Sequence, residues 1–307
     1  MFYNRSFINI LLILALINII AQNNQTTLKQ SESENPLSGG RGAVTIPQLG
    51  VVFRLEHDSL IYASGFQMLG ESVGRMLSPA LSEEQFLQNN IRIKNARCKV
   101  FLCNIFFPGS IKIAGPEVDE NRVLSYADTV LSRAQKAGVP FIILGSGGSR
   151  RIPEGYDVQK AKNDFIRLCK KLAVVAAKYK IIIALEGLQS SETNFLNTVK
   201  EAGEIAKAVN NLNFRLNADI FHMMRENESP QSIIDHADVI AHCEIAEKQT
   251  RSYPGVMGDD FKPYLRALKK ANYTGKIFIE GGTSDPVNDL PLSFKYLTRQ
   301  LKEVYAE

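Results

Sequence analysis

Four ionisable residues of this 307-residue chain stand at or near the ends of short apolar segments. Glu186 ends the segment IIIALE, Asp219 ends FRLNAD, His242 lies in VIAHCEI, and Glu280 ends KIFIE. A charged side chain in apolar surroundings is costly unless it is paired or binds a metal ion. Three carboxylates and one imidazole that converge would repel one another without a cation. The four residues therefore predict one site for a divalent metal ion.

The donor set of this predicted site is mainly oxygen. Such donors suit Mn²⁺, Mg²⁺ or Co²⁺ better than a structural zinc site does, although Zn²⁺ remains an alternative. Any one of these residues, taken alone, would more often be a surface residue or a salt-bridge partner. Their recurrence in successive apolar segments is what favours a shared site.

The elements that must position these residues alternate along the chain from residue 43 onward. Short, continuously apolar runs are typical of parallel strands covered on both faces, and the stretches between them carry apolar residues at helical spacing. We expect strands at residues 50–55, 66–72, 99–107, 140–145, 181–188, 214–221, 239–245 and 276–280. We expect helices at residues 57–63, 117–137, 156–179, 194–209, 229–237, 259–271 and 286–305.

Eight strands that alternate with helices predict an α/β fold, a single (β/α)8 TIM barrel over residues 43–307. A doubly wound open sheet is the alternative, but it predicts a Gly-rich nucleotide loop after an early strand. The sequence has neither GxGxxG nor a Walker motif, and the loop GSGGSRR at 145–151 lacks the Walker lysine. In a barrel, active sites lie at the carboxyl ends of the strands, so the four residues would form a ring at the mouth.

The chain begins with an apolar run at residues 7–20 (FINILLILALINII) behind a short start with one arginine. This run suits the core of a signal peptide and is shorter than the roughly 20 residues that span a bilayer. We expect residues 1–21 to be a signal peptide and the polar residues 22–42 to be a flexible linker. The protein would then be exported, periplasmic or secreted, with an uncleaved anchor as the alternative.

The overall composition is that of a globular protein. With 45% hydrophobic and 22% charged residues, it excludes wholesale disorder, collagen and coiled coil. A net charge of +4, from 36 basic and 32 acidic residues, is too balanced for a dedicated nucleic-acid-binding protein. We expect a small-molecule substrate and no nucleic-acid partner. Self-association is possible for such a barrel, but no interface can be read from the sequence.

The four cysteines are Cys98, Cys103, Cys169 and Cys243. Export would permit disulfides between them. However, Cys98 and Cys103 flank one expected strand and would point to opposite faces, and no spacing resembles a zinc knuckle. We therefore expect four buried free thiols.

Several segments of the chain resemble a known family, the sugar phosphate isomerase/epimerase group with a xylose isomerase-like TIM barrel, and are similar to tagatose and psicose 3-epimerases. The resemblance extends over residues 45–300 in order. The segments that carry it most clearly are ALEGLQSSETNFLNT (184–198), NADIFHMMRENES (217–229), IAHCEIAEKQTRSYPG (240–255) and IFIEGG (277–282).

The resemblance implies a role for each site residue. It implies that the metal ligands are the four residues Glu186, Asp219, His242 and Glu280. It implies that His222 and Arg251 hold the substrate, and Glu71 would face the same rim. Arg150 and Arg151 could contact a polyhydroxyl or anionic substrate, or only solvent. The chain departs from the family pattern at three positions, namely Gly187, Gln189 and Glu244, the last standing where many epimerases carry a second histidine.

The activity expected from this resemblance is that of an isomerase, a divalent-metal-dependent sugar epimerase or isomerase. A metal-bound keto sugar would lose a proton next to its carbonyl to form a metal-stabilised enediolate, with Glu186 and Glu280 as catalytic bases. The alternative is an exported lyase or hydratase that uses the same site for β-elimination on a 3-keto-glycoside. An endonuclease IV-like phosphodiesterase would need more histidines than the four present, and a non-catalytic sugar-binding module would not need four metal-capable residues.

Overall fold

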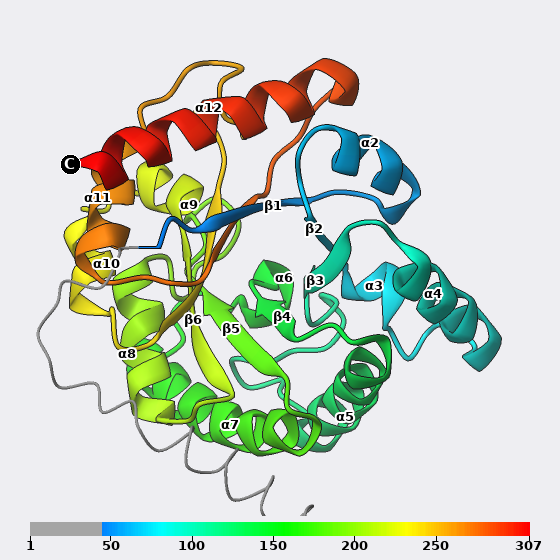
Figure 1. The fold of residues 1–307 in the computed structure, drawn as a ribbon. Coiled ribbons are helices and arrows are strands. Elements are labelled where there is room, and N and C mark those ends of the chain that lie inside the picture. Colours follow the sequence, from blue (N-terminus) through cyan, green and yellow to red (C-terminus); the bar gives the residue numbers. More distant parts are fainter. Residues whose placement is uncertain (1–44) are drawn as a thin grey trace, which may run out of the picture. The chain divides into compact units, whose positions relative to one another are not determined.

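The computed structural model describes residues 45–307, which contain a closed barrel of eight parallel strands (Figure 1). Hydrogen-bonded neighbours follow chain order, and β8 pairs with β1 to close the barrel. The strands are β1 (Gln48–Val52), β2 (Met68–Ser72), β3 (Lys99–Asn104), β4 (Phe141–Leu144), β5 (Ile182–Glu186), β6 (Phe214–Asp219), β7 (Ile240–Ile245) and β8 (Lys276–Ile279). The predicted TIM barrel is confirmed, and the open sheet is excluded. The predicted signal peptide (1–21) and linker (22–42) lie outside the described residues.

Helices surround the barrel, and ordinary capping residues fix where several of them begin. The longer helices are α4 (Glu83–Asn95), α5 (Glu120–Ala137), α7 (Val158–Tyr179), α8 (Val199–Val209), α11 (Lys262–Lys270) and α12 (Pro286–Ala306). Asp119, Asp157 and Thr198 each accept a hydrogen bond from the backbone N–H three residues ahead, at the starts of α5, α7 and α8. Because Thr198 is the cap, α8 begins at 199 and not at 194 as expected, and the preceding residues form a loop of the barrel mouth.

Shorter helices fill the connections, and several were not expected. They are η1 (Leu55–His57), α2 (Asp58–Ala63), α3 (Val73–Met76), α6 (Gly147–Arg150), α9 (Ile220–Arg225) and α10 (Gln231–Asp235). The longer α4 was also missed, although Ser82 and Gln85 form a capping box that the sequence displays as S-E-E-Q. Helices α6 and α9 matter for the site because each begins close behind a strand's carboxyl end.

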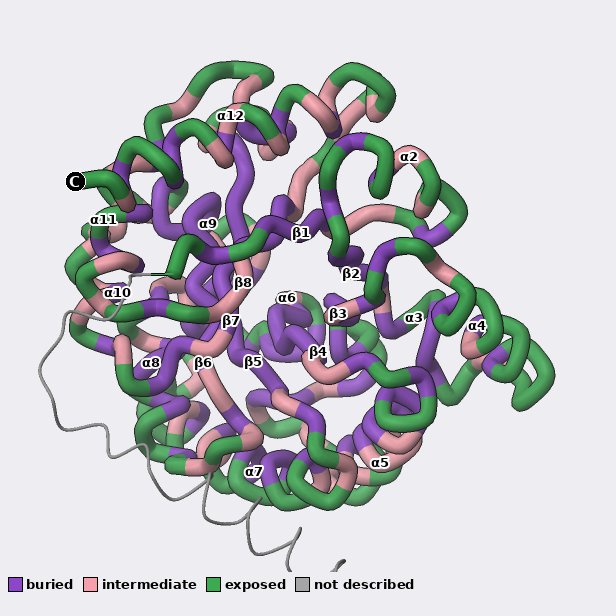
Figure 2. The backbone as a smooth tube through the Cα atoms, viewed as in Figure 1, coloured by how far each residue is buried: buried purple, intermediate pink, exposed green. Residues whose placement is uncertain are grey.

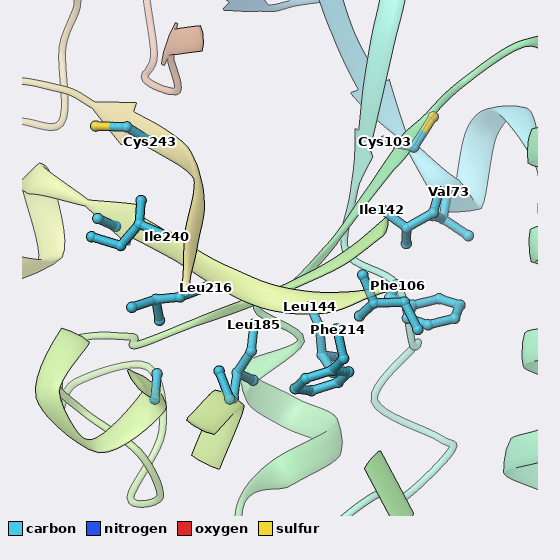
Figure 3. Close-up of a cluster of buried hydrophobic side chains, with 14 of the residues drawn as sticks. Val73, Cys103, Phe106, Ile142, Leu144, Leu185, Phe214, Leu216, Ile240 and Cys243 are labelled. Atoms are coloured by element: carbon cyan, nitrogen blue, oxygen red, sulfur yellow. The ribbon is translucent and has the colours of Figure 1, made fainter. Parts of the chain in front are cut away.

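Alternate strand residues face either the barrel interior or the surrounding helices. The interior contains a small apolar layer made by Met68, Leu102, Ile143, Ala184 and Phe278. The larger core lies between the strands and the helices, and Figure 3 shows part of it, including Leu185, Leu216 and Cys243. In Figure 2 the strands are largely buried, whereas the outer helix faces are exposed. The barrel is thus a packed scaffold whose polar side chains gather at one end.

All four cysteines are free and buried, as predicted. Burial raises the pKa of the Cys169 and Cys243 thiols well above the usual value, so these groups are held as uncharged thiols. Within residues 45–307, no helix has both the length and the apolar character needed to cross a membrane.

Candidate active site

The carboxyl ends of strands β5 to β8 bring four carboxylates together. Glu186 and Asp219 are the last residues of β5 and β6, Glu244 is the next-to-last residue of β7, and Glu280 directly follows β8. One oxygen of each side chain lies within 4.8 Å of the corresponding oxygens of the others. Three of the four are buried, and only the Glu280 side chain, 20% exposed, reaches solvent. Three of the four predicted metal ligands are therefore neighbours in the structure.

The fourth predicted ligand, His242, is not brought into this cluster. The register of β6 against β7 places Asp219 beside Glu244 and Asn217 beside His242, so the imidazole lies one layer deeper in the barrel. Its ring packs 5.2 Å from the Phe278 ring and 6.0 Å from the Phe141 ring, measured between centroids. Burial lowers the pKa of His242 to about 3, so the ring is neutral. Glu244 takes the place at the mouth that was predicted for His242.

The geometry of the carboxylate cluster fits one divalent ion. Ligands that lie about 2.1–2.4 Å from a shared cation are separated from each other by at most about 4.8 Å, as these oxygens are. Oε1 of Glu186 and Oδ2 of Asp219 are buried without a hydrogen-bond partner among the described residues. Such unpartnered buried oxygens are rare in a folded protein and point to a ligand.

Three acids of the cluster have raised pKa values because they are buried, away from water. Burial, together with the charges of its carboxylate neighbours, raises the pKa of Glu186 well above its usual range. The same causes raise the pKa of Glu244, and burial raises that of Asp219. Without a cation, these side chains cannot all ionise at neutral pH at little cost. A bound cation would reverse this by favouring the ionised forms.

His222 lies beside the cluster, on the first turn of α9, and is buried. Its Nδ1 accepts a hydrogen bond from the backbone N–H of Gln189, at 3.1 Å. Burial lowers the pKa of His222 to about 4, so the ring is neutral and its one proton is on Nε2. Within the described residues, Nε2 has no hydrogen-bond partner and faces Glu186 Oε1 at 3.5 Å and Asp219 Oδ2 at 3.7 Å. The predicted substrate residue is thus a donor aimed at the site.

A pocket of about 460 Å³ opens above the cluster. Of the four carboxylates, only Glu186 and Glu280 line it, while Asp219 and Glu244 are buried and do not. Arg251 also lines it, and its Nη2 donates to Glu280 Oε2 at 2.5 Å while Nη1 donates to Glu192 Oε1 at 3.0 Å. Burial alone would lower the pKa of Arg251, but the negative charges of Glu280 and Asp219 raise it.

Three residues that line this pocket have left-handed backbone. The φ angles are +60° at Ile105, +48° at Ser146 and +52° at Arg251. This conformation is unfavourable for a β-branched residue such as isoleucine and tends to persist only where the surroundings require it. Three of the eight non-glycine residues with a positive φ among the described residues therefore line the candidate site.

Comparison with known proteins identifies the family of this chain. Residues 64–300 match the family described as Xylose isomerase-like TIM barrel. The chain belongs to the xylose isomerase-like TIM barrel family. A curated relative, the L-ribulose 3-epimerase of Methylomonas sp. (strain DH-1), is 34% identical over 120 residues. That match covers 39% of this chain and 42% of the relative, so less than half of the relative's length is matched.

Solved structures show the same fold. A structure of L-ribulose 3-epimerase superposes with a TM-score of 0.73 at 18% identity, covering 85% of this chain and 96% of that one. The 3-keto-D-glucoside 4-epimerase of E. coli gives a TM-score of 0.69 at 20% identity, covering 82% and 99%. At this identity the likeness concerns the fold alone.

One of the two arginines in the loop at 145–151 differs from what the sequence suggested. Arg150 was expected to meet substrate or solvent, but it is fully buried, and its Nη1 donates to the backbone carbonyl of Glu186 at 2.6 Å. Burial lowers its pKa to about 10. Arg151 is exposed and donates to the carbonyl of Glu192 at 3.0 Å. Arg150 therefore supports the end of β5 from behind the site.

Glu71, a predicted substrate residue, is buried at the end of β2 and is not among the residues that line the mouth pocket. Its Oε1 accepts from the Leu55 N–H at 2.8 Å. Its Oε2 accepts from the Ser72 N–H at 3.1 Å and from Arg75 Nε at 3.2 Å. Every carboxylate oxygen of Glu71 thus has a partner within the protein, and the structure does not bring this side chain into the cluster.

Sequence reasoning missed several residues that shape the site. The amides of Asn104 and Asn217 donate to Glu244 at 3.1 Å and 2.5 Å. Gly145 leaves room for Glu186, because a Cβ atom built there would lie 2.5 Å from Glu186 Oε2. The strand periodicity could have indicated both asparagines. Asn217 stands two residues before Asp219, so it lies on the same strand face, and Asn104 is the last residue of β3.

Proposed function

We propose that this protein is a divalent-metal-dependent sugar epimerase that inverts a carbon next to the carbonyl of a keto sugar. The observation that carries this proposal is that Glu186 and Glu280 alone among the clustered carboxylates line the pocket. They come from β5 and β8, with two strands between them, and so approach a bound molecule from different sides. The 3-epimerase names of the curated relatives support the same reaction class.

Inversion requires that a proton leave one face of the carbon and return to the other. With a cation in the cluster both carboxylates would be held ionised, and Arg251 places a further positive charge beside Glu280. The carboxylate on one face could then take the proton, and the group on the other face, once protonated from solvent, could return one.

The remaining site residues would orient the carboxylates and hold the ion. A divalent ion in the carboxylate cluster would polarise the carbonyl and adjacent hydroxyl oxygens of the sugar and acidify the C–H between them. Asp219 is buried and does not line the pocket, so its role would be to hold the ion. His222 is also buried and outside the pocket lining, so its Nε2 proton would orient Glu186 and Asp219, which it faces at 3.5 and 3.7 Å, and Arg251 would hold Glu280 in place.

The predicted signal peptide at residues 1–21 leads us to propose further that the enzyme is exported. Phosphorylated sugars are largely cytoplasmic, so the substrate would be an unphosphorylated ketose or a glycoside. The β-elimination alternative shares the proton removal and differs from epimerisation in the next step, where a leaving group departs. The proposal predicts instead that the proton returns.

The experiment that tests the proposal is incubation of metal-supplemented protein in D2O with free ketoses and, separately, with 3-keto-glycosides. The expected result is deuterium at the carbon next to the carbonyl together with the epimeric sugar, both lost on chelation. An unsaturated product from the keto-glycosides would instead establish the lyase. No exchange with any sugar in the presence of Mn²⁺, Mg²⁺ or Co²⁺ would contradict both.

A further inference from the structure

Strand β7 places the carboxylate of Glu244 in the cluster, where the imidazole of His242 was expected. We infer that Glu244, and not His242, completes a metal site made of four carboxylates, and that this substitution shifts the site's preference from Zn²⁺ toward hard cations such as Mn²⁺ and Mg²⁺. The inference rests on the proposed function, since it concerns the ion of the same site. It adds a ligand that the family likeness does not supply, and it strengthens the preference for hard cations that the oxygen-rich donor set already indicated.

Glu244 is held in a ligand position by two amides. Asn217 Nδ2 donates to its Oε2 at 2.5 Å, and Asn104 Nδ2 donates to its Oε1 at 3.1 Å. The Asn104 amide also donates to Glu280, so one side chain from β3 aligns two of the four carboxylates across the barrel. A carboxylate oxygen accepts two hydrogen bonds, so each Glu244 oxygen keeps a lone pair for an ion.

The two nearby imidazoles are not placed to complete the four-carboxylate cluster. His242 is fully buried beside Phe278 and is not among the residues whose donor atoms gather within 4.8 Å, although its Nε2, 3.9 Å from Glu244 Oε1, has no hydrogen-bond partner among the described residues. His222 uses the lone pair of Nδ1 to accept from Gln189, which leaves a proton on Nε2, the atom that faces the cluster. A protonated nitrogen cannot bind a cation. Oxygen is therefore the donor at every position of the site.

The donor type decides which cations the site prefers. Imidazole is a strong ligand for Zn²⁺ and other late transition ions, whereas Mg²⁺ and Mn²⁺ suit carboxylate oxygen. Compared with a histidine at the same position, Glu244 provides an oxygen in place of the imidazole nitrogen and adds a negative charge. The absolute affinity order still follows the general series for divalent metals, so the property to compare is the ratio of Zn²⁺ to Mn²⁺ affinity between variants.

The ligand set can be read directly by pulsed EPR of the full chain loaded with Mn²⁺. Wild-type protein should show no ¹⁴N modulation from directly coordinated imidazole. The Glu244→His variant should show it, because the ring would occupy the ligand position. The variant can be accommodated, since Oδ1 of Asn104 and Oδ1 of Asn217 lack partners among the described residues and could accept from the new ring after an amide flip.

Metal affinities provide the second readout. Zn²⁺ and Mn²⁺ are titrated against a competing chelator with metal-free wild type and with the Glu244→His and His242→Leu variants. Glu71→Gln serves as a control for loss of a buried carboxylate outside the cluster. We expect Glu244→His to raise the Zn²⁺-to-Mn²⁺ affinity ratio by about tenfold or more. His242→Leu and Glu71→Gln should change the ratio by less than about twofold.

The outcomes separate this inference from the proposed function. Wild-type ¹⁴N coupling that disappears in His242→Leu would restore His242 as the ligand and overturn the inference, while metal binding itself would still stand. An unchanged affinity ratio in a folded, metal-binding Glu244→His variant, with folding checked by circular dichroism, would also overturn it. Failure of the wild type to bind any divalent ion would instead remove the proposed function.

Discussion

Two kinds of buried carboxylate lie near the mouth of this barrel, and their surroundings are opposite. Glu71 and Glu247 have every side-chain oxygen engaged, and Glu247 accepts from the N–H groups of Gly255, Gly258 and Asp259 at 2.6, 3.1 and 2.9 Å. In the cluster, by contrast, Glu186 Oε1 is buried beside other acids without a partner among the described residues. The first kind links a loop to a strand through hydrogen bonds, whereas Glu186, of the second kind, has a carboxylate oxygen that no donor among the described residues engages.

This difference shows that burial of an acid does not by itself indicate function. Glu71 and the buried cluster residues are almost equally inaccessible, and all stand near strand ends. What separates Glu71 from Glu186 and Asp219 is whether the protein itself supplies a donor for every carboxylate oxygen. Glu244 and Glu280 do accept hydrogen bonds from neighbouring side chains, and what they share with Glu186 and Asp219 is the crowding of four acids in one place. Satisfied acids should stabilise the fold, whereas the cluster acids should reduce its stability until a cation is bound.

The comparison is tested most strongly by Glu280→Gln. Because Gln cannot take up a proton, we expect the exchange of deuterium at the substrate carbon to fall by about 10³-fold or more. Because the change also breaks the ion pair with Arg251, folding of the variant is checked by circular dichroism and by its denaturant midpoint. Turnover within about tenfold of the wild type would show that Glu280 is not a catalytic base.

Metal addition should have the next largest effect. Mn²⁺ at about 100 times its dissociation constant should raise the free energy of unfolding by about 2.7 kcal/mol, because only the folded chain assembles the cluster. Thermal unfolding with and without chelator measures this. The double variant Glu244→Gln/Glu280→Gln should lose the effect, while Glu247→Gln should keep it. Equal stabilisation of the double variant would place the ion elsewhere.

The satisfied acids should respond in the opposite way. Glu71→Gln breaks the ion pair with Arg75 and one backbone acceptor, so we expect the free energy of unfolding to fall by about 2 kcal/mol, read from a denaturant titration. A kinetic assay of the same variant settles its other predicted role. A large rise in KM with stability unchanged would show that Glu71 contacts the substrate, as the sequence predicted.

The sequence predicted the barrel well because a closed parallel barrel leaves a pattern at every unit. Eight apolar runs, separated by helices, are enough to indicate strand number and order, and the strand ends then locate the mouth. Which residue of β7 reaches the mouth was harder to predict, since His242 and Glu244 lie on the same face of the strand and differ in depth. That depth depends on a register shift between Leu216 and Asn217 of β6, which no local pattern reveals.

The partners of the cluster were hidden for a related reason. Asn104 and Glu244 are 140 residues apart and meet only because the barrel closes. Arg150 had a surface-like pattern in the loop GSGGSRR, yet the short helix α6 turns it inward beneath the end of β5. Contacts that depend on closure and on short loop helices cannot be inferred from residue spacing alone.

The smallest expected effect is that of Glu244→Gln, and it tests most directly the difference between the clustered acids and the satisfied ones. Glu244→Gln in metal-free protein should raise the free energy of unfolding at neutral pH by on the order of 1 kcal/mol, because it removes an acid that must either carry a buried charge among like charges or hold a proton that it would lose in the unfolded chain. The amide can still accept one of the hydrogen bonds that Asn104 and Asn217 donate. Glu247→Gln, the matched change of a satisfied acid, should lower stability by a similar amount.

The pH dependence gives this prediction its sign. Burial raises the folded-state pKa of Glu244 above the usual value of 4.5, so the folded chain binds the proton more tightly than the unfolded chain. Its contribution to stability is therefore present below pH 4.5 and is lost as the pH rises through the folded-state pKa. Metal-free wild type should become less stable over that range more steeply than Glu244→Gln does. Parallel stability profiles of the two proteins would mean that Glu244 does not hold its proton in the metal-free fold, and that it belongs with the satisfied acids.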